Sequence, residues 1–144
     1  MQRIPLVLAS SILLAGAGAA SAQTMSNAEA ISQIATVCKN DIARFCRGVP
    51  LGPRLRACFD ANAARMSPQC QQTTGVVYAS ITRRAAAQRD IGDVCSADIL
   101  RLCGTSFADA NLVTCMAGLA PQAMSARCYQ TFVDTGWATE KARP

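Results

Sequence analysis

The chain contains no histidine and few aromatic residues: its 144 residues include one Trp, two Tyr and four Phe. Histidine is the commonest base beside a Ser or Cys nucleophile and a common zinc ligand. Its absence argues against hydrolases of the Ser–His or Cys–His kind. No C-x-x-C motif occurs, and no two cysteines lie closer than eight residues apart, unlike a redox centre or a structural zinc site. We therefore expect no enzyme, no catalytic residue, no metal and no cofactor, with a thiol redox or zinc-binding protein as the most distant alternative.

Apolar runs long enough to span a membrane are also lacking. The one long run, residues 4–14, follows Arg3 and precedes residues 20–22, whose sequence Ala-Ser-Ala has the form of a signal-peptidase site. This run is shorter than the roughly 20 apolar residues that a membrane helix needs. We expect residues 1–22 to be a signal peptide, with an uncleaved anchor as the alternative. Residues 23–144 are then a mature chain that is exported, to the periplasm or the medium, and does not span the membrane.

Eight cysteines in two sets of four dominate the mature chain. Successive cysteines are 8, 12 and 12 residues apart in the first set and 8, 12 and 13 apart in the second. A shift of 57 residues, or 58 after one insertion, aligns the two sets. The same shift aligns other residues: Val37 with Val94, Asp41 with Asp98, Ile42 with Ile99, Arg44 with Arg101, Leu55 with Leu112, and Met66-Ser67 with Met124-Ser125. This self-similarity predicts two copies of one structural unit, residues 23–91 and 92–144.

Each repeat carries apolar residues at helical spacing. In the first repeat one stripe runs from Ile34 to Cys46 and a second from Leu55 to Met66. Capping residues predict helix starts at Ser26, Ser67, Asp93, Ser106 and Ser125, and helix ends at Gly48 and Gly104. Residues 73–82 are rich in β-branched side chains, but we predict a helix because a lone strand would have no partner. The expected fold class is all-α, with two tandem disulfide-stapled helical hairpins, each followed by a third helix.

The four cysteines of a repeat can pair in three ways, and export favours disulfides over free thiols. Cys38 and Cys46 on one helix would be separated by a rise of roughly 12 Å. A disulfide requires Cα atoms within about 7 Å of each other. Crossed pairing would join distant ends of an antiparallel hairpin. The nested arrangement is left, and it predicts four bridges: Cys38–Cys70, Cys46–Cys58, Cys95–Cys128 and Cys103–Cys115.

The first repeat resembles a known family. The segment VCKNDIARFCRGVPLGPRLRACF, followed by MSPQC, is similar to the cysteine-rich repeat of the Golgi apparatus protein that serves as a cysteine-rich fibroblast growth factor receptor and E-selectin ligand. Small exported bacterial proteins carry the same repeat. The resemblance covers residues 38–70 and 95–128, and it implies a two-repeat bacterial member. The second copy departs from it, because GTSFADANL replaces the Gly/Pro loop and no proline precedes Cys128. The growth-factor and selectin roles belong to much larger animal proteins and are not extended to this chain.

Positive charge is concentrated in the first repeat. Residues 23–91 contain nine basic and four acidic side chains, whereas residues 92–144 contain four and five. Guanidinium groups bind phosphate, sulfate and carboxylate well. The candidate anion-binding residues are Arg47, Arg54, Arg56 and Arg65, with Arg83, Arg84 and Arg89 further along the chain. We expect a binding module whose partner is an anionic envelope component, glycan or protein. Export and the lack of interleaved aromatics argue against nucleic acid.

The alternative function is a structural or stress-tolerance protein with no specific ligand, in which the arginines only solvate an alanine-rich helical surface. The repeated carboxylates fit a structural role. Asp41 and Asp98 each precede an arginine by three residues, the spacing of a helical ion pair with Arg44 and Arg101. Trp137 is expected to cover the last helix. Salt-sensitive binding to anionic surfaces would favour the binding module over the structural protein.

Overall fold

A computed structural model describes residues 24–104 and 109–137, and within these ranges the protein is helical, without any β-strand. The all-α fold class is therefore confirmed. The helices follow one another as α1 (Asn27–Val37), α2 (Lys39–Phe45), α3 (Pro53–Asn62), the 3-10 turn η1 (Ala63–Arg65), α4 (Pro68–Val94), α5 (Ser96–Cys103), α6 (Asp109–Gly118), the 3-10 turn η2 (Pro121–Ala123) and α7 (Ala126–Asp134). Among the described helices, none combines the length and the hydropathy needed to cross a membrane.

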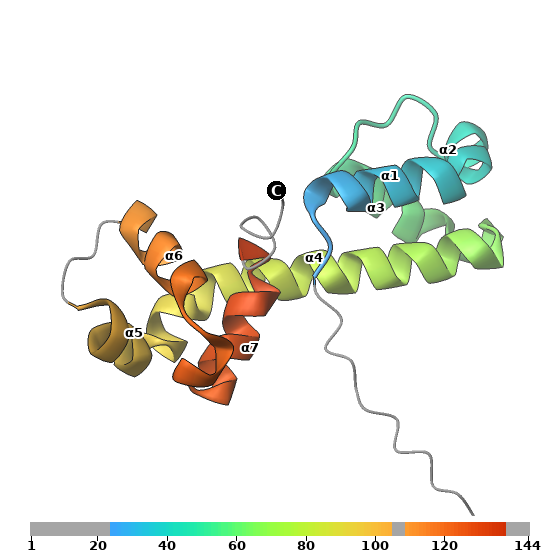
Figure 1. Ribbon diagram of the computed structural model, residues 1–144. Coiled ribbons are helices and arrows are strands. Elements are labelled where there is room, and N and C mark those ends of the chain that lie inside the picture. The colour runs from blue at the N-terminus through green and yellow to red at the C-terminus, as the bar shows by residue number, and fades with distance from the viewer. Residues whose placement is uncertain (1–23, 105–108, 138–144) are drawn as a thin grey trace, which may run out of the picture.

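Helix α4 is the axis of the molecule (Figure 1). It contains 27 residues, which corresponds to a length of about 40 Å. Helices α1, α2 and α3 lie beside one half of α4, and α5, α6 and α7 lie beside the other half. The expected boundary between residues 91 and 92 falls inside α4. The two repeats are thus joined by a continuous helix.

Serine side chains begin three of the helices, as the sequence predicts. The Ser26 hydroxyl accepts a hydrogen bond from the Glu29 amide, and the Glu29 carboxylate accepts one from the Ser26 amide, which completes a capping box. Ser67 caps α4 and is followed by Pro68 at the first helical position. Ser125 caps α7. Ser106, the expected cap of α6, lies outside the described residues.

The chain bends at the first cysteine of each repeat, which the sequence analysis did not predict. One helix was expected from Ile34 through Cys46, but α1 ends at Val37 and α2 begins after Cys38. A new helix was expected at Asp93, but α4 continues to Val94 and bends at Cys95. Both cysteines have φ close to −95° and ψ near 0°, at the edge of the helical region. The bend lets α1 pack along α4 while α2 is joined to α3.

The four disulfides have the nested arrangement. Cys38–Cys70 and Cys95–Cys128 have Cα atoms 4.9 Å apart in each case. Cys46–Cys58 and Cys103–Cys115 have Cα atoms 6.0 and 5.9 Å apart. All eight cysteines are bonded. The outer bridge of each repeat ties the bend to the third helix, and the inner bridge closes the hairpin.

Each repeat has its own hydrophobic core. The first contains the buried side chains Ala30, Ile34, Leu55, Phe59, Met66 and Val77 around Cys38, Cys46 and Cys70. The second contains Ile91, Ile99, Met116, Met124 and Phe132 around Cys95 and Cys128, and Trp137 packs against it. With few aromatic rings, these cores depend on half-cystines and methionines to fill space. Cross-links compensate for small cores of this kind.

Helix α4 serves both repeats. In the sequence alignment of the two repeats, α1 corresponds to the last turns of α4, and the first turns of α4 correspond to α7. The packing has the same symmetry, because α1 lies along α4 just as α4 lies along α7. Helix α4 is therefore the third helix of the first repeat and the first helix of the second. Residues 73–82 lie inside it, so the helix predicted there is confirmed.

Hydrogen bonds join the start of the described chain to its end across α4. The Thr24 hydroxyl donates to the Asp134 carbonyl at 2.6 Å. The Met25 amide donates to the Ser80 hydroxyl at 2.7 Å, and the Arg84 guanidinium donates to the Met25 carbonyl at 3.3 Å. These bonds fix the segment before α1 against the middle of α4 and the end of α7.

Candidate binding site

The predicted anion-binding arginines do not form one cluster. Arg65 in η1 lies with its guanidinium carbon 4.8 Å from the centre of the Phe45 ring, and it donates a hydrogen bond to Asn62. Arg44 in α2 contacts the same ring at 5.1 Å. Phe45 therefore carries two guanidinium groups at the junction of α2 and η1, and cation–π attraction holds both there.

Arg47 and Arg54 border the loop between α2 and α3. Both are exposed, and neither forms an ion pair with any residue in the described part of the chain. Arg54 stands in the first turn of α3, which contains no acidic residue, and its N-cap Gly52 offers no side chain to the free amides. The helix dipole places partial positive charge at this end. The positive charge of Arg54 and the positive end of the α3 dipole therefore lie close together on the surface.

Arg56 lies two residues further into α3 and contacts Tyr78 of α4. Its guanidinium carbon is 4.8 Å from the centre of the Tyr78 ring, and its Nε atom is 3.9 Å from Oδ2 of Asp60. Burial raises the pKa of Tyr78, the charge of Asp60 adds to this, and Arg56 opposes it. Tyr78 is therefore a neutral platform on which the planar guanidinium is stacked.

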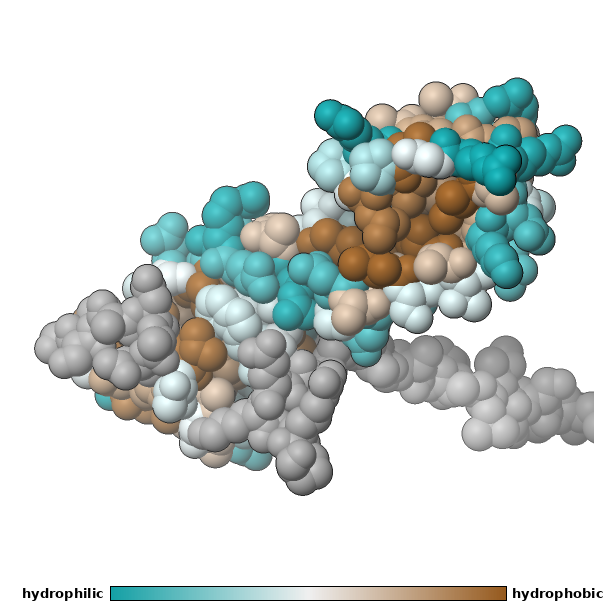
Figure 2. Space-filling model, turned by 90° about the horizontal axis from the view of Figure 1, so that it is seen from above, coloured by the Kyte–Doolittle hydropathy of each residue, from teal (hydrophilic) through white to brown (hydrophobic). Residues whose placement is uncertain are grey.

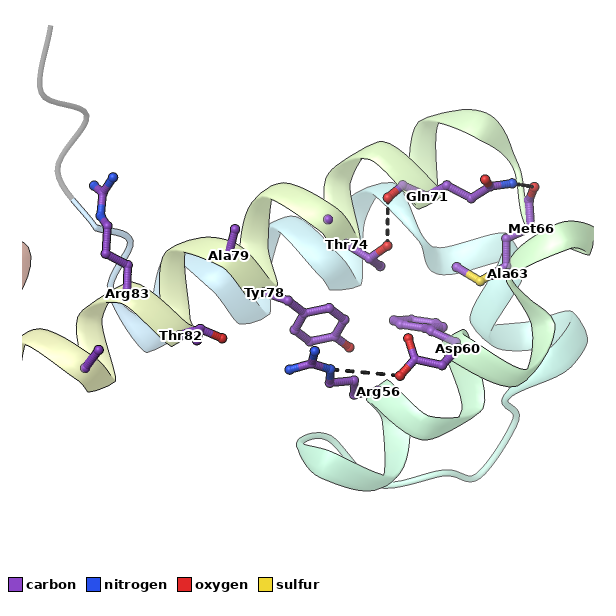
Figure 3. Close-up of a pocket in the computed structure, with 13 residues that line it drawn as sticks. Arg56, Asp60, Ala63, Met66, Gln71, Thr74, Tyr78, Ala79, Thr82 and Arg83 are labelled. Carbon is purple, nitrogen blue, oxygen red and sulfur yellow. Dashed lines mark hydrogen bonds and ion pairs between the residues drawn. The ribbon is translucent and has the colours of Figure 1, made fainter. Parts of the chain in front are cut away.

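A pocket of about 710 Å³ lies between α3 and α4, with these three side chains on its wall (Figure 3). Arg56, Asp60 and Tyr78 point toward one another near the middle of the lining, between Arg83 on one side and Gln71 on the other. At the Gln71 end the Gln71 amide donates to the Met66 carbonyl, and the Thr74 hydroxyl donates to the Gln71 carbonyl. These polar groups are already bonded within the chain, so the exposed charged groups of Arg56 and Asp60 are the ones that could contact a ligand.

The arginines of α4 have structural partners. Arg83 pairs with Asp134 at 3.3 Å, and Arg89 pairs with Asp90 at 3.5 Å. Arg84 donates to the Met25 carbonyl. Two of these three contacts join α4 to segments outside it. The structure therefore separates arginines that hold helices together from those that face solvent at the first loop.

Asp41 and Asp98 link the helix after each bend to the serine that caps the third helix of the repeat. Asp41 accepts hydrogen bonds from the Ser67 amide at 3.0 Å and the Ser67 hydroxyl at 2.7 Å. Asp98 accepts one from the Ser125 amide at 2.9 Å. Sequence analysis missed these contacts, although the shifts that align the cysteines also align both the aspartates and the serines. Both carboxylates are buried, so they have a structural role.

The predicted helical ion pair forms in the second repeat only. Nη2 of Arg101 lies 2.5 Å from Oδ1 of Asp98 and also donates a hydrogen bond to the Ala123 carbonyl at 2.8 Å. Hydrogen bonds from Ser125 and then Arg101 lower the pKa of Asp98 from 3.8 to about 2. The expected pair between Arg44 and Asp41 is absent from the described residues, because Arg44 contacts Phe45 and Ser67 occupies the carboxylate.

In the described part of the chain, no three His, Cys, Asp or Glu side chains are grouped as metal ligands. Comparisons with family models, with curated proteins and with solved structures found no match for this chain. The resemblance of its repeats to the cysteine-rich repeat family therefore stays a prediction from the residues. Function has to be argued from the surface of the first repeat.

Proposed function

We propose that the protein is an exported binding module whose first repeat binds an anionic partner through the arginines at its first loop. The observation that carries this proposal is the state of Arg47 and Arg54. They are exposed and unpaired within the described chain, while Arg83 and Arg101 are engaged in contacts between elements. Because no contact within the described chain occupies these two guanidinium groups, they are available to an anionic partner.

The position of Arg54 supports the same proposal. A cation in the first turn of a helix opposes the helix dipole, at a cost of about 0.3–1 kcal/mol. A bound phosphate, sulfate or carboxylate would reverse this effect, because the dipole and the guanidinium groups would attract it together. Four disulfides suit a chain that works in the oxidising periplasm or outside the cell. The partner class is an anionic envelope component, glycan or protein.

Replacing Arg47, Arg54 and Arg56 together with Gln tests the proposal. We expect the triple variant to leave a heparin column at lower salt than the wild type. Its thermal midpoint should change little, because exposed charges are each worth about 1 kcal/mol or less. Wild-type retention should weaken above about 0.1 M salt, where the screening length falls below about 10 Å.

The control carries the same loss of charge elsewhere. Lys39, Arg89 and Arg127 are exposed and lie outside the loop, and their replacement by Gln also removes three positive charges. This control should be retained more strongly than the loop variant. Equal retention of the two variants would show that only net charge matters. No retention of the wild type at low salt would leave the structural or stress-tolerance function as the better reading.

A further inference from the structure

An apolar groove of about 560 Å³ runs along the first repeat beside Arg56. Its aliphatic side chains come from every long element of the repeat. They are Ile31 and Ile34 of α1, Leu51 of the first loop, Leu55 of α3, and Val77 and Ile81 of α4. The volume lies within the roughly 300–1,000 Å³ typical of small-molecule sites. Figure 2 shows a continuous apolar area on this lobe, bordered by hydrophilic side chains.

The mouth of the groove holds apolar side chains that folding has not buried. Ile31 is 47% exposed and Leu51 is 57% exposed, although both are large and aliphatic. The floor is different, because Ile34, Leu55 and Val77 are each at most 5% exposed. Exposed apolar side chains that adjoin a concave apolar surface mark a binding site more often than isolated ones do.

The second repeat shows which of these residues the fold itself requires. The floor residues Ile34 and Leu55 correspond to Ile91 and Leu112, which are also apolar. By contrast, the mouth residue Ile31 corresponds to Gln88, and the floor residue Val77 corresponds to Thr135. Gln88 donates a hydrogen bond to the Thr135 carbonyl at 3.0 Å, so a polar contact joins the helices where the first repeat has its groove.

Two polar side chains of the groove, Arg56 and Tyr78, are also absent from the matching positions of the second repeat. Arg56 corresponds to Val113 and Tyr78 to Gly136. The helix pair therefore forms without an arginine or an aromatic ring at these positions. The groove and its arginine are additions to the first repeat and are not needed to build the unit.

Arg56 places one positive charge on the wall of the groove. Its side chain is 53% exposed, and the one acidic side chain that pairs with it among the described residues, Asp60, is 70% exposed with a long 3.9 Å contact. Such an exposed ion pair contributes little to the stability of the fold. Stacking on Tyr78 orients the guanidinium plane and leaves its outer N–H groups available for a carboxylate, which arginine binds in bidentate fashion.

From these features we infer that the groove binds a free single-chain amphiphile of the fatty-acid class. The aliphatic chain lies along Ile31, Leu51 and Ile81, and the carboxylate meets Arg56. The inference rests on the proposed function in one respect, since it takes Arg56 as a residue that meets anionic groups. It adds the ligand class, which the basic loop alone does not determine.

Titration calorimetry of the mature protein with dodecanoate, below its micelle concentration, tests the inference. We expect one site per chain. Ile31→Gln places at the mouth the residue that the second repeat carries there, and it should weaken binding by about tenfold or more. Arg56→Gln should weaken dodecanoate to the level of dodecan-1-ol while leaving the alcohol unchanged. Leu100→Gln, at an equally exposed leucine of the second repeat, should have no effect.

Failure of this inference can be distinguished from failure of the proposed function. Ile31→Gln should still be retained on heparin like the wild type. No dodecanoate binding with heparin retention intact would overturn the groove inference alone, and so would equal losses in the Ile31 and Leu100 variants. Binding to phosphatidylglycerol vesicles that Ile31→Gln abolishes, without binding of free dodecanoate, would also overturn it, in favour of a membrane surface.

Discussion

Asp98 joins three parts of the second repeat through one carboxylate. It accepts from the Ser125 amide that begins α7 and from Arg101 one turn along α5. Arg101 in turn reaches the Ala123 carbonyl in η2. Because these donors stabilise the ionised form, the charge of Asp98 is linked to the folded state.

The stability of the second repeat should therefore depend on pH in the acid range. The pKa of Asp98 is lowered from 3.8 to about 2 on folding, so its contribution is fully present above pH 4 and is lost as the pH falls toward 2. We expect Asp98→Asn to lower the thermal midpoint at pH 7. The difference between wild type and variant should shrink between pH 4 and pH 2.

Thermal melts at a series of pH values measure this difference. Asp60→Asn removes an exposed carboxylate and is the control, for which we expect no comparable pH dependence. A difference between wild type and Asp98→Asn that stays constant down to pH 2 would contradict the prediction.

Asp41, which aligns with Asp98, shows what the spacing of single residues cannot predict. The spacing of Asp41 and Arg44 is the same as that of Asp98 and Arg101, yet only the second pair forms. Arg44 is followed by Phe45, whose ring attracts its guanidinium, whereas Arg101 is followed by Leu102. Sequence spacing gives the partners that a side chain can reach, and neighbouring residues decide which one it takes.

At the scale of elements, the two disulfide bridges of a repeat join different pairs of segments. Cys46–Cys58 spans 12 residues and closes the hairpin of α2 and α3. Cys38–Cys70 spans 32 residues and holds the bend against α4. In the loop-entropy model bridges of this size contribute roughly 3–4 kcal/mol each, more for the longer loop. Domains are stable by only about 5–15 kcal/mol, so either bridge matters to folding.

Removing the outer bridge should therefore cost more than removing the inner one. We expect Cys38→Ala with Cys70→Ala to lower the free energy of unfolding about 1 kcal/mol more than Cys46→Ala with Cys58→Ala. Urea unfolding of the two double variants, followed by circular dichroism, gives this comparison. The corresponding pairs in the second repeat should rank in the same order. A larger loss from either inner bridge would argue against the loop-length account.

Most elements could be predicted because their ends are marked locally. Ser26 with Glu29, and Ser67 with Pro68, show where helices begin, and the cysteine spacing with simple helix geometry is enough to select the nested pairs. The bend at Cys38 could not be predicted, since no glycine or proline stands there. It follows from packing, because α1 must lie along α4 while α2 turns toward α3.

At the scale of the whole molecule, the shared helix α4 joins the two hydrophobic cores. Sequence analysis placed a boundary between residues 91 and 92 and did not predict a helix that serves both sides. Its alanine-rich middle, residues 83–90, carries few apolar side chains that would indicate what it packs against. Likewise, the groove beside Arg56 depends on side chains from α1, α3 and α4, which only the tertiary structure brings together.

A break in α4 should separate the unfolding of the two repeats. Ala85 is exposed near the middle of this helix, between the two cores. Ala85→Pro costs a helix about 3 kcal/mol, whereas Ala85→Gly costs about 1 kcal/mol. We expect the wild type and the glycine variant to unfold in one calorimetric transition and the proline variant to show two. A single transition in the proline variant would show that contacts other than α4 couple the cores.

Because one helix closes the first unit and opens the next, this architecture fixes how such a chain can grow. An added copy has to begin on the free face of a long third helix, and the chain can lengthen only by whole units. Helix α7 is not such a platform. It contains nine residues, and Gly136, with φ near +77°, stands where α4 continues through Tyr78. Glycine favours this left-handed conformation and ends helices, so α7 stops at the position where α4 continues for several more turns.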